Sequence, residues 1–362
     1  MLRQFFSTYT VTDYLHPDVK DVKYDCGLGT NPFLDEQIIQ QCMDQLRWTM
    51  NAYTFEAYEH LKDRLADYWS VLGVTRKNIA LGSGSFGLMR DTCAWSLDRG
   101  GLALGYAPQF TRFESEVWLR QAHYRYVEMS GSGQPKDLGH FQAETFIEAI
   151  SEDVNLVYLD NPNNPTGQII GVDDIATIVE AADRVGAVVL VDEAYGDYMD
   201  TQESAIALVG SYQNLVVIRS ASKFFGLPNH RVGYVFAHES LIDIYDKIGN
   251  PFPFTDFSAR VFCSVLDQAD TFAASKIRTA QAKSRLMMDL PDYAFTSPKT
   301  PILAIPVPSE RLASHGILAE GCSLNPVLGH PFSRIRIHPH MDSLTPVLIQ
   351  CYTQGDINYD FG

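Results

Sequence analysis

The sequence predicts an α/β protein with a mostly parallel central sheet flanked by helices, together with a smaller α+β domain. Between residues 79 and 237, apolar runs typical of buried strands alternate with amphipathic helical patterns. This order is typical of parallel sheets covered by helices on both faces. The chain then changes to proline-rich pieces around 298–308 and a short strand pattern at 333–337, which indicates a second, smaller unit.

The first strand of the alternating region leads into a glycine-rich turn. Residues 78–81 form an apolar strand pattern, and Gly-Ser-Gly-Ser-Phe-Gly follows at 82–87 before a helical stretch at 88–95. Backbone N–H groups at the start of such a helix can hold an anion, helped by the helix dipole. The same letters satisfy the dinucleotide fingerprint Gly-x-Gly-x-x-Gly. That fingerprint needs an acidic residue after the next strand, whereas the strand pattern at 101–106 ends in an aromatic residue with a proline close behind.

Two further strand patterns end in polar side chains. The apolar run 156–159 leads into an Asn-Pro turn that contains Asn164, and the run 188–191 ends in Asp192, with Tyr195 shortly after. Apolar residues between the two runs recur at helical spacing, which predicts a crossover helix. Because the carboxyl ends of parallel strands meet at one edge of a sheet, these polar side chains should lie together at a ligand site.

The most informative segment follows the apolar run 214–218. Lys223 stands three residues after one hydroxyl, that of Ser220, and directly after another, that of Ser222, and Arg231 comes eight residues later. A lysine amine in such surroundings can form a Schiff base with a carbonyl group. A short Ser-x-Ser-Lys match also fits an exposed lysine on a turn, but the order of the upstream motifs favours a chemical role.

Taken together, these segments resemble the fold-type I pyridoxal 5′-phosphate (PLP) enzymes, the superfamily of class I and II aminotransferases. The resemblance extends over nearly the whole chain and is closest to the histidinol-phosphate aminotransferase group. It implies a PLP-dependent aminotransferase that moves the amino group of an L-amino acid to a 2-oxo acid through a Schiff base on Lys223. It also implies a large PLP-binding domain at 46–260 and a small α+β domain at 261–362, to which an N-terminal segment, 1–45, contributes.

The resemblance assigns roles around the cofactor ring. Asp192 would hold the protonated pyridine nitrogen, which would give this buried carboxylate the cation that it needs and make the ring an electron sink. Asn164 and Tyr195 would bind the ring's phenolate oxygen, and Phe110 would stack on the ring. In this reading the catalytic residues are Lys223, Asp192 and Tyr195.

The resemblance also assigns the cofactor phosphate to the glycine-rich turn and to the lysine segment. The backbone N–H groups of Ser85 and Phe86 would bind it together with Ser220, Ser222 and Arg231. Many relatives carry an acidic pair where this chain has Phe86 and Gly87. The backbone cradle is still possible here, but the surroundings of the ring differ from those in such relatives.

Tyr53 precedes a helical pattern at 56–69. Its segment resembles the one whose tyrosine reaches the phosphate bound by the neighbouring subunit. The resemblance therefore implies a homodimer in which each active site is completed by the partner's tyrosine. A simple surface tyrosine is the alternative reading.

Substrate recognition is assigned to three positions. Arg334, in the strand pattern Arg-Ile-Arg-Ile, would take the substrate α-carboxylate through a bidentate pair, and Asn31 resembles a residue that lines the substrate side. Relatives that bind a phosphorylated side chain usually have arginine after a Gly-Ile-x-x segment, whereas this chain has Glu320. An acidic residue there would repel phosphate and favour an amine or guanidinium, which predicts a non-phosphorylated, basic amino acid as substrate.

Composition narrows the remaining possibilities. The formal net charge of −16 disfavours nucleic acid as a partner. Six scattered cysteines without a Cys/His cluster argue against a disulfide framework and against a metal site. We expect neither a membrane span nor a secretory leader, and the scattered cysteines favour the cytoplasm.

Three alternatives to transamination stay open at the sequence level. The same site could decarboxylate an amino acid, or carry out oxidation or replacement chemistry, because the anchoring motifs do not decide which bond at Cα breaks. An NAD(P)-dependent oxidoreductase is disfavoured by the missing ribose-binding acid. A non-catalytic scaffold would need none of the chemical side chains collected above.

Overall fold

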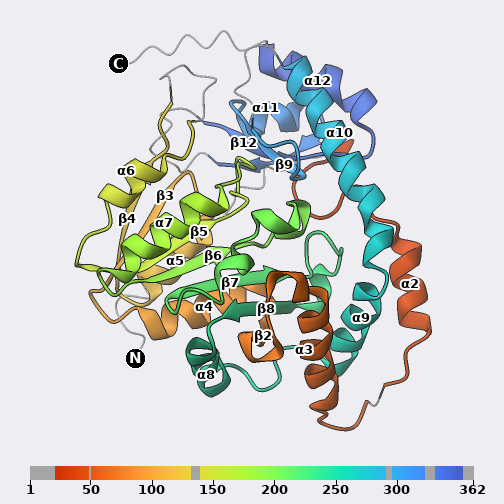
Figure 1. The fold of residues 1–362 in the computed structure, drawn as a ribbon. Coiled ribbons are helices and arrows are strands. Elements are labelled where there is room, and N and C mark those ends of the chain that lie inside the picture. The colour runs from red at the N-terminus through yellow and green to blue at the C-terminus, as the bar shows by residue number, and fades with distance from the viewer. Residues whose placement is uncertain (1–20, 49, 132–138, 291–295, 323–330, 354–362) are drawn as a thin grey trace, which may run out of the picture.

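A seven-stranded sheet forms the centre of the larger part of the molecule (Figure 1). The computed structural model describes residues 21–48, 50–131, 139–290, 296–322 and 331–353. The strand order is β2-β8-β7-β6-β5-β3-β4, and within this sheet β8 runs in the direction opposite to that of the other strands. The strands are β2 (Ile79–Ser83), β3 (Leu102–Ala107), β4 (His123–Glu128), β5 (Val154–Asp160), β6 (Val188–Asp192), β7 (Leu215–Ser220) and β8 (Val232–Ala237).

Helices cover both faces of this sheet, because alternate residues of the central strands point to opposite sides. Val157 and Val189 pack in one buried cluster, and their neighbours Leu156 and Leu190 pack in another. The first cluster lies under α2 (Glu36–Asp44), α3 (Glu56–Tyr68), α6 (Ala143–Glu148), α7 (Val172–Asp183) and α9 (Asp256–Leu266). The second lies under α4 (Gly84–Ser96), α5 (Thr111–Leu119) and α8 (Glu239–Ile248). Burial of each such apolar side chain contributes about 1.5–3 kcal/mol, which holds the layers together.

The structure confirms the predicted α/β class and the mostly parallel sheet. The strands predicted from apolar runs correspond to β2, β3, β5, β6 and β7, and the predicted crossover helix is α7. The half-exposed strand β4 was not predicted, because its sequence His-Tyr-Arg-Tyr-Val-Glu lacks an apolar run.

The C-terminal part forms a second, smaller layer beside the sheet (Figure 1). Its strands β11 (Glu320–Gly321), β12 (Ser333–Arg336) and β9 (Ile302–Ile305) form an antiparallel sheet in that order. Its helices are α10 (Ala273–Asp289), α11 (Ser309–Ser314) and α12 (Met341–Thr353). This arrangement confirms the predicted α+β character and the predicted strand around 333–337.

The N-terminal segment joins this smaller layer. Strand β1 (Tyr24–Asp25) pairs in parallel with β10 (Ile317–Leu318), and Cys26 packs in the core of the C-terminal part. The core of the larger part includes Phe262 and Phe272, so its packing extends beyond the boundary predicted at residue 260. The division into domains stays a prediction.

A buried ion cluster braces the strands that carry the site. Arg219, on β7, pairs with Glu193 through Nη2–Oε2 at 2.6 Å and with Asp197 through Nη1–Oδ1 at 2.9 Å. Its guanidinium carbon also lies 4.5 Å from the centroid of the Trp69 ring. Because Arg219 precedes Ser220 and Glu193 follows Asp192, this cluster ties together the carboxyl ends of β6 and β7.

Short 3₁₀ helices connect several elements, at Ser70–Leu72, Arg76–Asn78, Gly196–Tyr198, Thr201–Glu203, Ala205–Leu208, Pro228–His230 and Ala269–Phe272. No helix in the described part of the chain is long and apolar enough to cross a membrane.

Candidate active site

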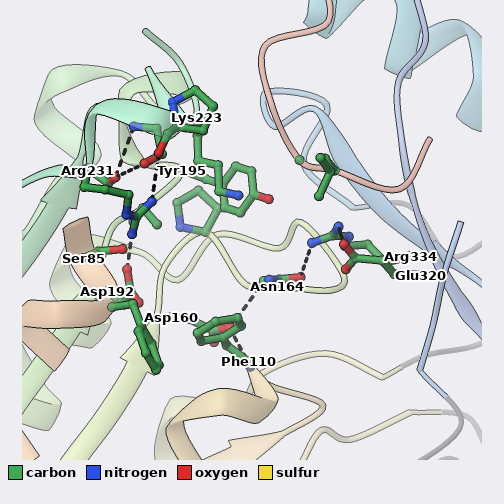
Figure 2. A pocket seen from close by; sticks show the side chains of 18 residues that line it. Ser85, Phe110, Asp160, Asn164, Asp192, Tyr195, Lys223, Arg231, Glu320 and Arg334 are labelled. Atoms are coloured by element: carbon green, nitrogen blue, oxygen red, sulfur yellow. Dashed lines mark hydrogen bonds and ion pairs between the residues drawn. The ribbon is translucent and has the colours of Figure 1, made fainter. Parts of the chain in front are cut away.

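A cavity of about 220 Å³ lies at the carboxyl ends of β5, β6 and β7, where it also meets β11 and β12 of the smaller layer (Figure 2). Open α/β sheets bind ligands at this edge. The cavity brings together most of the residues selected from sequence: Ser85, Phe86, Phe110, Asn164, Asp192, Tyr195, Ser220, Ser222, Lys223, Arg231, Glu320 and Arg334. These residues come from segments spread over some 250 positions of the chain, and the fold places them around one space.

Lys223 follows the end of β7 and its turn is held from both sides. The Ser222 N–H donates to Ser220 Oγ at 3.1 Å, and the Ser220 hydroxyl donates to Ser222 Oγ at 2.8 Å. The Asn31 N–H donates to the Lys223 carbonyl at 3.1 Å. The Lys223 Nζ lies 5.4 Å from the centroid of the Tyr195 ring. The lysine is therefore anchored through its backbone, with its amine facing the cavity.

Asp192 ends β6 and is buried against the cavity. Its Oδ1 accepts the Ala194 N–H at 3.0 Å, and its Oδ2 accepts the Tyr158 hydroxyl at 3.2 Å. Burial raises the pKa of the Asp192 carboxyl to about 6, although these two bonds and the charge of Lys223 oppose the rise. A buried carboxyl of this kind is stabilised by a cation in the cavity.

Close backbone packing brings Arg231 and the N-terminus of α4 together beside the cavity. Gly84 begins α4 with a φ of +72°, and a Cβ there would lie 2.4 Å from Nη2 of Arg231. A Cβ on Gly233 would lie 2.3 Å from the carbonyl carbon of Gly84. Arg231 itself has a φ of +55°, an uncommon conformation for a residue with a side chain. Two glycines thus let the arginine and the N-terminus of α4 approach each other, a combination suited to an anion.

Arg334 and Glu320 form the wall opposite the lysine. They are direct neighbours on the paired strands β12 and β11, and Arg334 Nη2 lies 2.5 Å from Glu320 Oε1. Both side chains are buried. Arg334 also donates to the Asn164 Oδ1 at 3.2 Å and to the Gly27 carbonyl. The predicted carboxylate-binding arginine therefore reaches the cavity, already paired with the acidic residue predicted to select the substrate.

The other predicted substrate residue, Asn31, lies outside the residues that line the cavity. Its side-chain amide donates to the Phe224 carbonyl and to Ser275 Oγ, both at 2.9 Å, and its Oδ1 accepts the Phe33 N–H. Through these bonds and its backbone N–H, Asn31 braces the Lys223 turn, and its contact with a substrate stays a prediction. In its place, Leu28 and Gly29 of the same segment line the cavity.

Tyr53 also lies away from the cavity of its own chain. Its side chain is 83% exposed and packs on Phe252 with ring centroids 4.7 Å apart. Phe55 packs on the same ring, and both belong to an exposed aromatic surface. Tyr53 does not line the cavity of its own chain, and its exposed ring can be contacted by another molecule.

The family model for aminotransferase class I and II matches residues 26–345. The chain belongs to this family. Histidinol-phosphate aminotransferase from Caldanaerobacter subterraneus is 30% identical over 254 residues, covering 69% of this chain and 68% of that protein. The enzyme of that name from a Thermoanaerobacter species is 26% identical over 319 residues, covering 86% and 85%.

A solved structure agrees with this placement. The crystal structure of histidinol-phosphate aminotransferase from Sinorhizobium meliloti in complex with PLP has a TM-score of 0.80 and 21% identity, and the match covers 97% of both chains. This aminotransferase therefore has the fold-type I architecture. It is a PLP-dependent enzyme that transfers amino groups, and the dinucleotide alternative is not retained.

The residues present in this aminotransferase fit PLP. Asp192 is a buried carboxyl that favours a cation, as the ring nitrogen would provide. The Tyr195 hydroxyl is buried and makes no hydrogen bond within the described ranges; the phenolate oxygen of the cofactor is an acceptor that such a donor needs. No group of three or more His, Cys, Asp or Glu side chains suited to a metal is present among the residues described.

Sequence reasoning missed one polar residue of the site, Asp160. It ends β5, directly beside Asp192 in the sheet, and lines the cavity. The signal was available, because this acidic residue stands at the end of an apolar run just as Asp192 does. Its partners lie in two different turns, and this could not be seen without the fold.

The raised pKa of Asp192 predicts a pH-dependent effect of the isosteric change Asp192→Asn. Because the folded-state pKa, about 6, exceeds the ordinary 3.8, the contribution of Asp192 to stability is full below about pH 4 and is lost as the pH rises through 6. Asparagine avoids this loss, and its amide can still serve Ala194 and Tyr158. We expect the cofactor-free variant to gain about 3 kcal/mol over the wild type at pH 8.

Urea unfolding of the cofactor-free proteins between about pH 4 and pH 8 measures this difference. The same variant should lose amino transfer, because a neutral amide cannot keep a pyridine nitrogen protonated. A stability difference that does not grow with pH would contradict the assigned shift.

Proposed function

We propose that this aminotransferase binds PLP covalently through a Schiff base on Lys223 and uses the freed lysine amine to move the substrate's Cα proton. The observation that carries the proposal is the convergence of Lys223, Asp192 and Tyr195 on one cavity. PLP supplies an electron sink for the charge that develops at Cα when it is bound. Lys223 serves as base and then as acid, since its Nζ faces the cavity from a turn held by two serines and Asn31.

The remaining side chains would position the cofactor. The N–H groups at the start of α4, at Ser85 and Phe86, would hold its phosphate with Ser220, Ser222 and Arg231. Phe110 would stack on one face of the ring, and Asn164 and Tyr195 would hold its phenolate oxygen. Support comes from their presence around one cavity with Asp192 at its buried end.

We propose that the protein is a homodimer in which Tyr53 completes the partner's phosphate site. The exposed aromatic side chains Trp48, Tyr53 and Phe55, which pack on the half-buried Phe257 and Phe252, support an association of this kind, because exposed apolar side chains that gather on a surface favour protein contacts. A cytoplasmic location is part of the same proposal and rests on the dispersed free cysteines.

The amino donor that we propose is a non-phosphorylated amino acid with a basic side chain. The sequence relatives carry the name histidinol-phosphate aminotransferase, yet a phosphate would meet the buried acidic Glu320 at the wall of this cavity. Glu320 already faces one guanidinium, that of Arg334. If the substrate carboxylate binds Arg334, the guanidinium of Arg334 is shared between that carboxylate and Glu320. A cationic side chain on the substrate would then give Glu320 a second partner of opposite charge.

Decarboxylation is the second candidate, because L-threonine-O-3-phosphate decarboxylase from Porphyromonas gingivalis shares the fold, with a TM-score of 0.72 at 14% identity. The fold alone does not select the bond that breaks. The sequence relatives favour amino transfer. Arg334 supports this choice, since a substrate carboxylate bound to it is retained rather than released.

Lys223→Ala tests the central role. The wild type loaded with PLP should show a visible absorption band that a single amino acid donor bleaches, with stoichiometric formation of its oxo acid. The variant should bind PLP more weakly, lack that band and lose turnover by at least about a thousandfold, because both the covalent link and the proton carrier are gone. Near-normal turnover in Lys223→Ala would overturn the proposed function. If the wild type releases carbon dioxide and forms no oxo acid, the result would support decarboxylation.

Glu320→Gln tests the substrate proposal with matched donors. The donors are compared in two pairs, lysine with norleucine and arginine with citrulline, because the members of each pair differ mainly in side-chain charge. The wild type should favour the charged member of each pair, and the variant should reduce that preference about tenfold in kcat/KM. Glu320→Arg should reverse the preference toward anionic side chains. If the ratios stay the same in both variants, Glu320 does not select the side chain; an equal change for both members of a pair would report on Arg334 alone.

Subunit complementation tests the shared site. Tyr53→Ala and Lys223→Ala should each be poorly active, but an equal mixture that has exchanged subunits should recover about a quarter of wild-type activity, since half the dimers then hold one intact site. A mixture no more active than its parents, despite verified exchange, would place Tyr53 outside the partner's site.

A further inference from the structure

Asp160 connects two turns that reach the cavity from different parts of the chain. One turn, Gln109-Phe110, leads into α5, and the other, Asn163-Asn164, follows β5. The Asp160 carboxylate lies between them, only 3% exposed, and lines the cavity (Figure 2). Its place at the end of β5, rather than in either turn, makes it a fixed point of the sheet.

The carboxylate accepts hydrogen bonds from both turns. Its Oδ2 accepts the backbone N–H of Phe110 at 3.1 Å and that of Asn164 at 3.0 Å. Its Oδ1 accepts the Asn163 side-chain amide at 3.0 Å and that of Gln109 at 3.4 Å. A single oxygen thus holds the backbones of the two residues whose side chains are proposed to contact the cofactor ring.

The charge of Asp160 serves these bonds directly. Four of the donors to its carboxylate are N–H groups, and bonds from N–H to an ionised acceptor are shorter and stronger than neutral ones. Burial raises the pKa of Asp160 to about 7, while the bonds from Asn164 and Asn163 oppose the rise. Burying a carboxylate costs free energy. A neutral amide side chain could hold the same two turns at a lower cost.

We propose that Asp160 is a positioning residue that sets the relative placement of Phe110 and Asn164, and so the width and alignment of the slot for the cofactor ring. The inference rests on the proposed function, which assigns the stacking role to Phe110 and the phenolate contact to Asn164. In this proposal Asp160 contacts neither the substrate's Cα nor the Lys223 amine. It acts through the backbone of both residues, from a strand end that lies in register with Asp192.

The alternative is that Asp160 only stabilises the fold. A purely structural role would lower the stability of the cofactor-free protein and leave the loaded site unchanged. A positioning role also changes how tightly PLP is held, and it changes the pH at which the cofactor's visible band titrates. That titration is sensitive to Asn164, because a donor to the ring oxygen weakens its hold on the proton of the Lys223 nitrogen.

The experiment compares Asp160→Ala and Asp160→Asn with the wild type and with Asp197→Asn. Asp160→Asn fills the same volume and keeps one acceptor oxygen, so the test does not depend on the alanine variant folding. Asp197→Asn is the matched control, since it also removes a buried carboxylate that follows β6, but its partner is Arg219 rather than Phe110 or Asn164. PLP dissociation is measured by equilibrium dialysis, the visible band is titrated, and cofactor-free unfolding is recorded.

For Asp160→Ala we expect a PLP dissociation constant raised at least about tenfold, and for Asp160→Asn an intermediate value, because charge-assisted bonds to both turns are lost. The midpoint of the band's titration should rise by about half a pH unit or more in both. The control should be less stable to unfolding but within about twofold of the wild type in PLP affinity, with an unchanged midpoint.

Unchanged PLP affinity and an unchanged midpoint in folded Asp160→Asn would overturn the inference, whatever its stability. An equal loss of PLP affinity in the control would overturn it as well, since the effect would then belong to any buried acid. Failure of the proposed function is separate, because it would appear as the absence of a Lys223-dependent visible band in the wild-type protein itself.

Discussion

The register of the parallel strands β5, β6 and β7 is the constraint on which the site depends. Asp160 lies beside Asp192 in this register, and β7 ends at Ser220, from which the chain turns to Lys223. A slip of one residue would turn every side chain of a strand to the opposite face. The apolar residues of both faces are buried under helices, so a slip would also expose a core layer. Core packing therefore fixes the position of the reactive groups.

The buried carboxyl groups at this edge of the sheet reduce the free energy of unfolding. Two carboxyl groups with raised pKa values, Asp160 and Asp192, end neighbouring strands in a buried place. Behind them, Arg219 compensates Glu193 and Asp197 within the core. Sites that hold a charged ligand commonly contain groups that oppose folding until the ligand arrives. In this molecule the surrounding hydrogen bonds and ion pairs limit that cost without removing it.

Much of this arrangement could be predicted from sequence because its signals are local. Apolar runs that end in Asp192 or precede Lys223 define strands and their chemical ends together, and the structure confirms the parallel sheet built from them. What could not be predicted are contacts set by the fold. The bond from Asp160 to Phe110 spans 50 positions and the pair of Glu320 with Arg334 depends on the pairing of two short strands. Asn31 was assigned by analogy, and only its bonds to Phe224 and Ser275 reveal that it braces a turn.

The pairing of β1 with β10 has a consequence for the order in which the molecule assembles. The residues that a chain contributes to its own proposed cofactor site lie between positions 85 and 231 and can come together while the chain is still being synthesised. The wall that carries Arg334 closes against Gly27, a contact between residues 307 positions apart. Contacts of such separation form late, because the entropy of closing so long a loop must be overcome first. In a newly made chain, the part of the cofactor site that this chain contributes would accordingly form before the wall that binds the substrate.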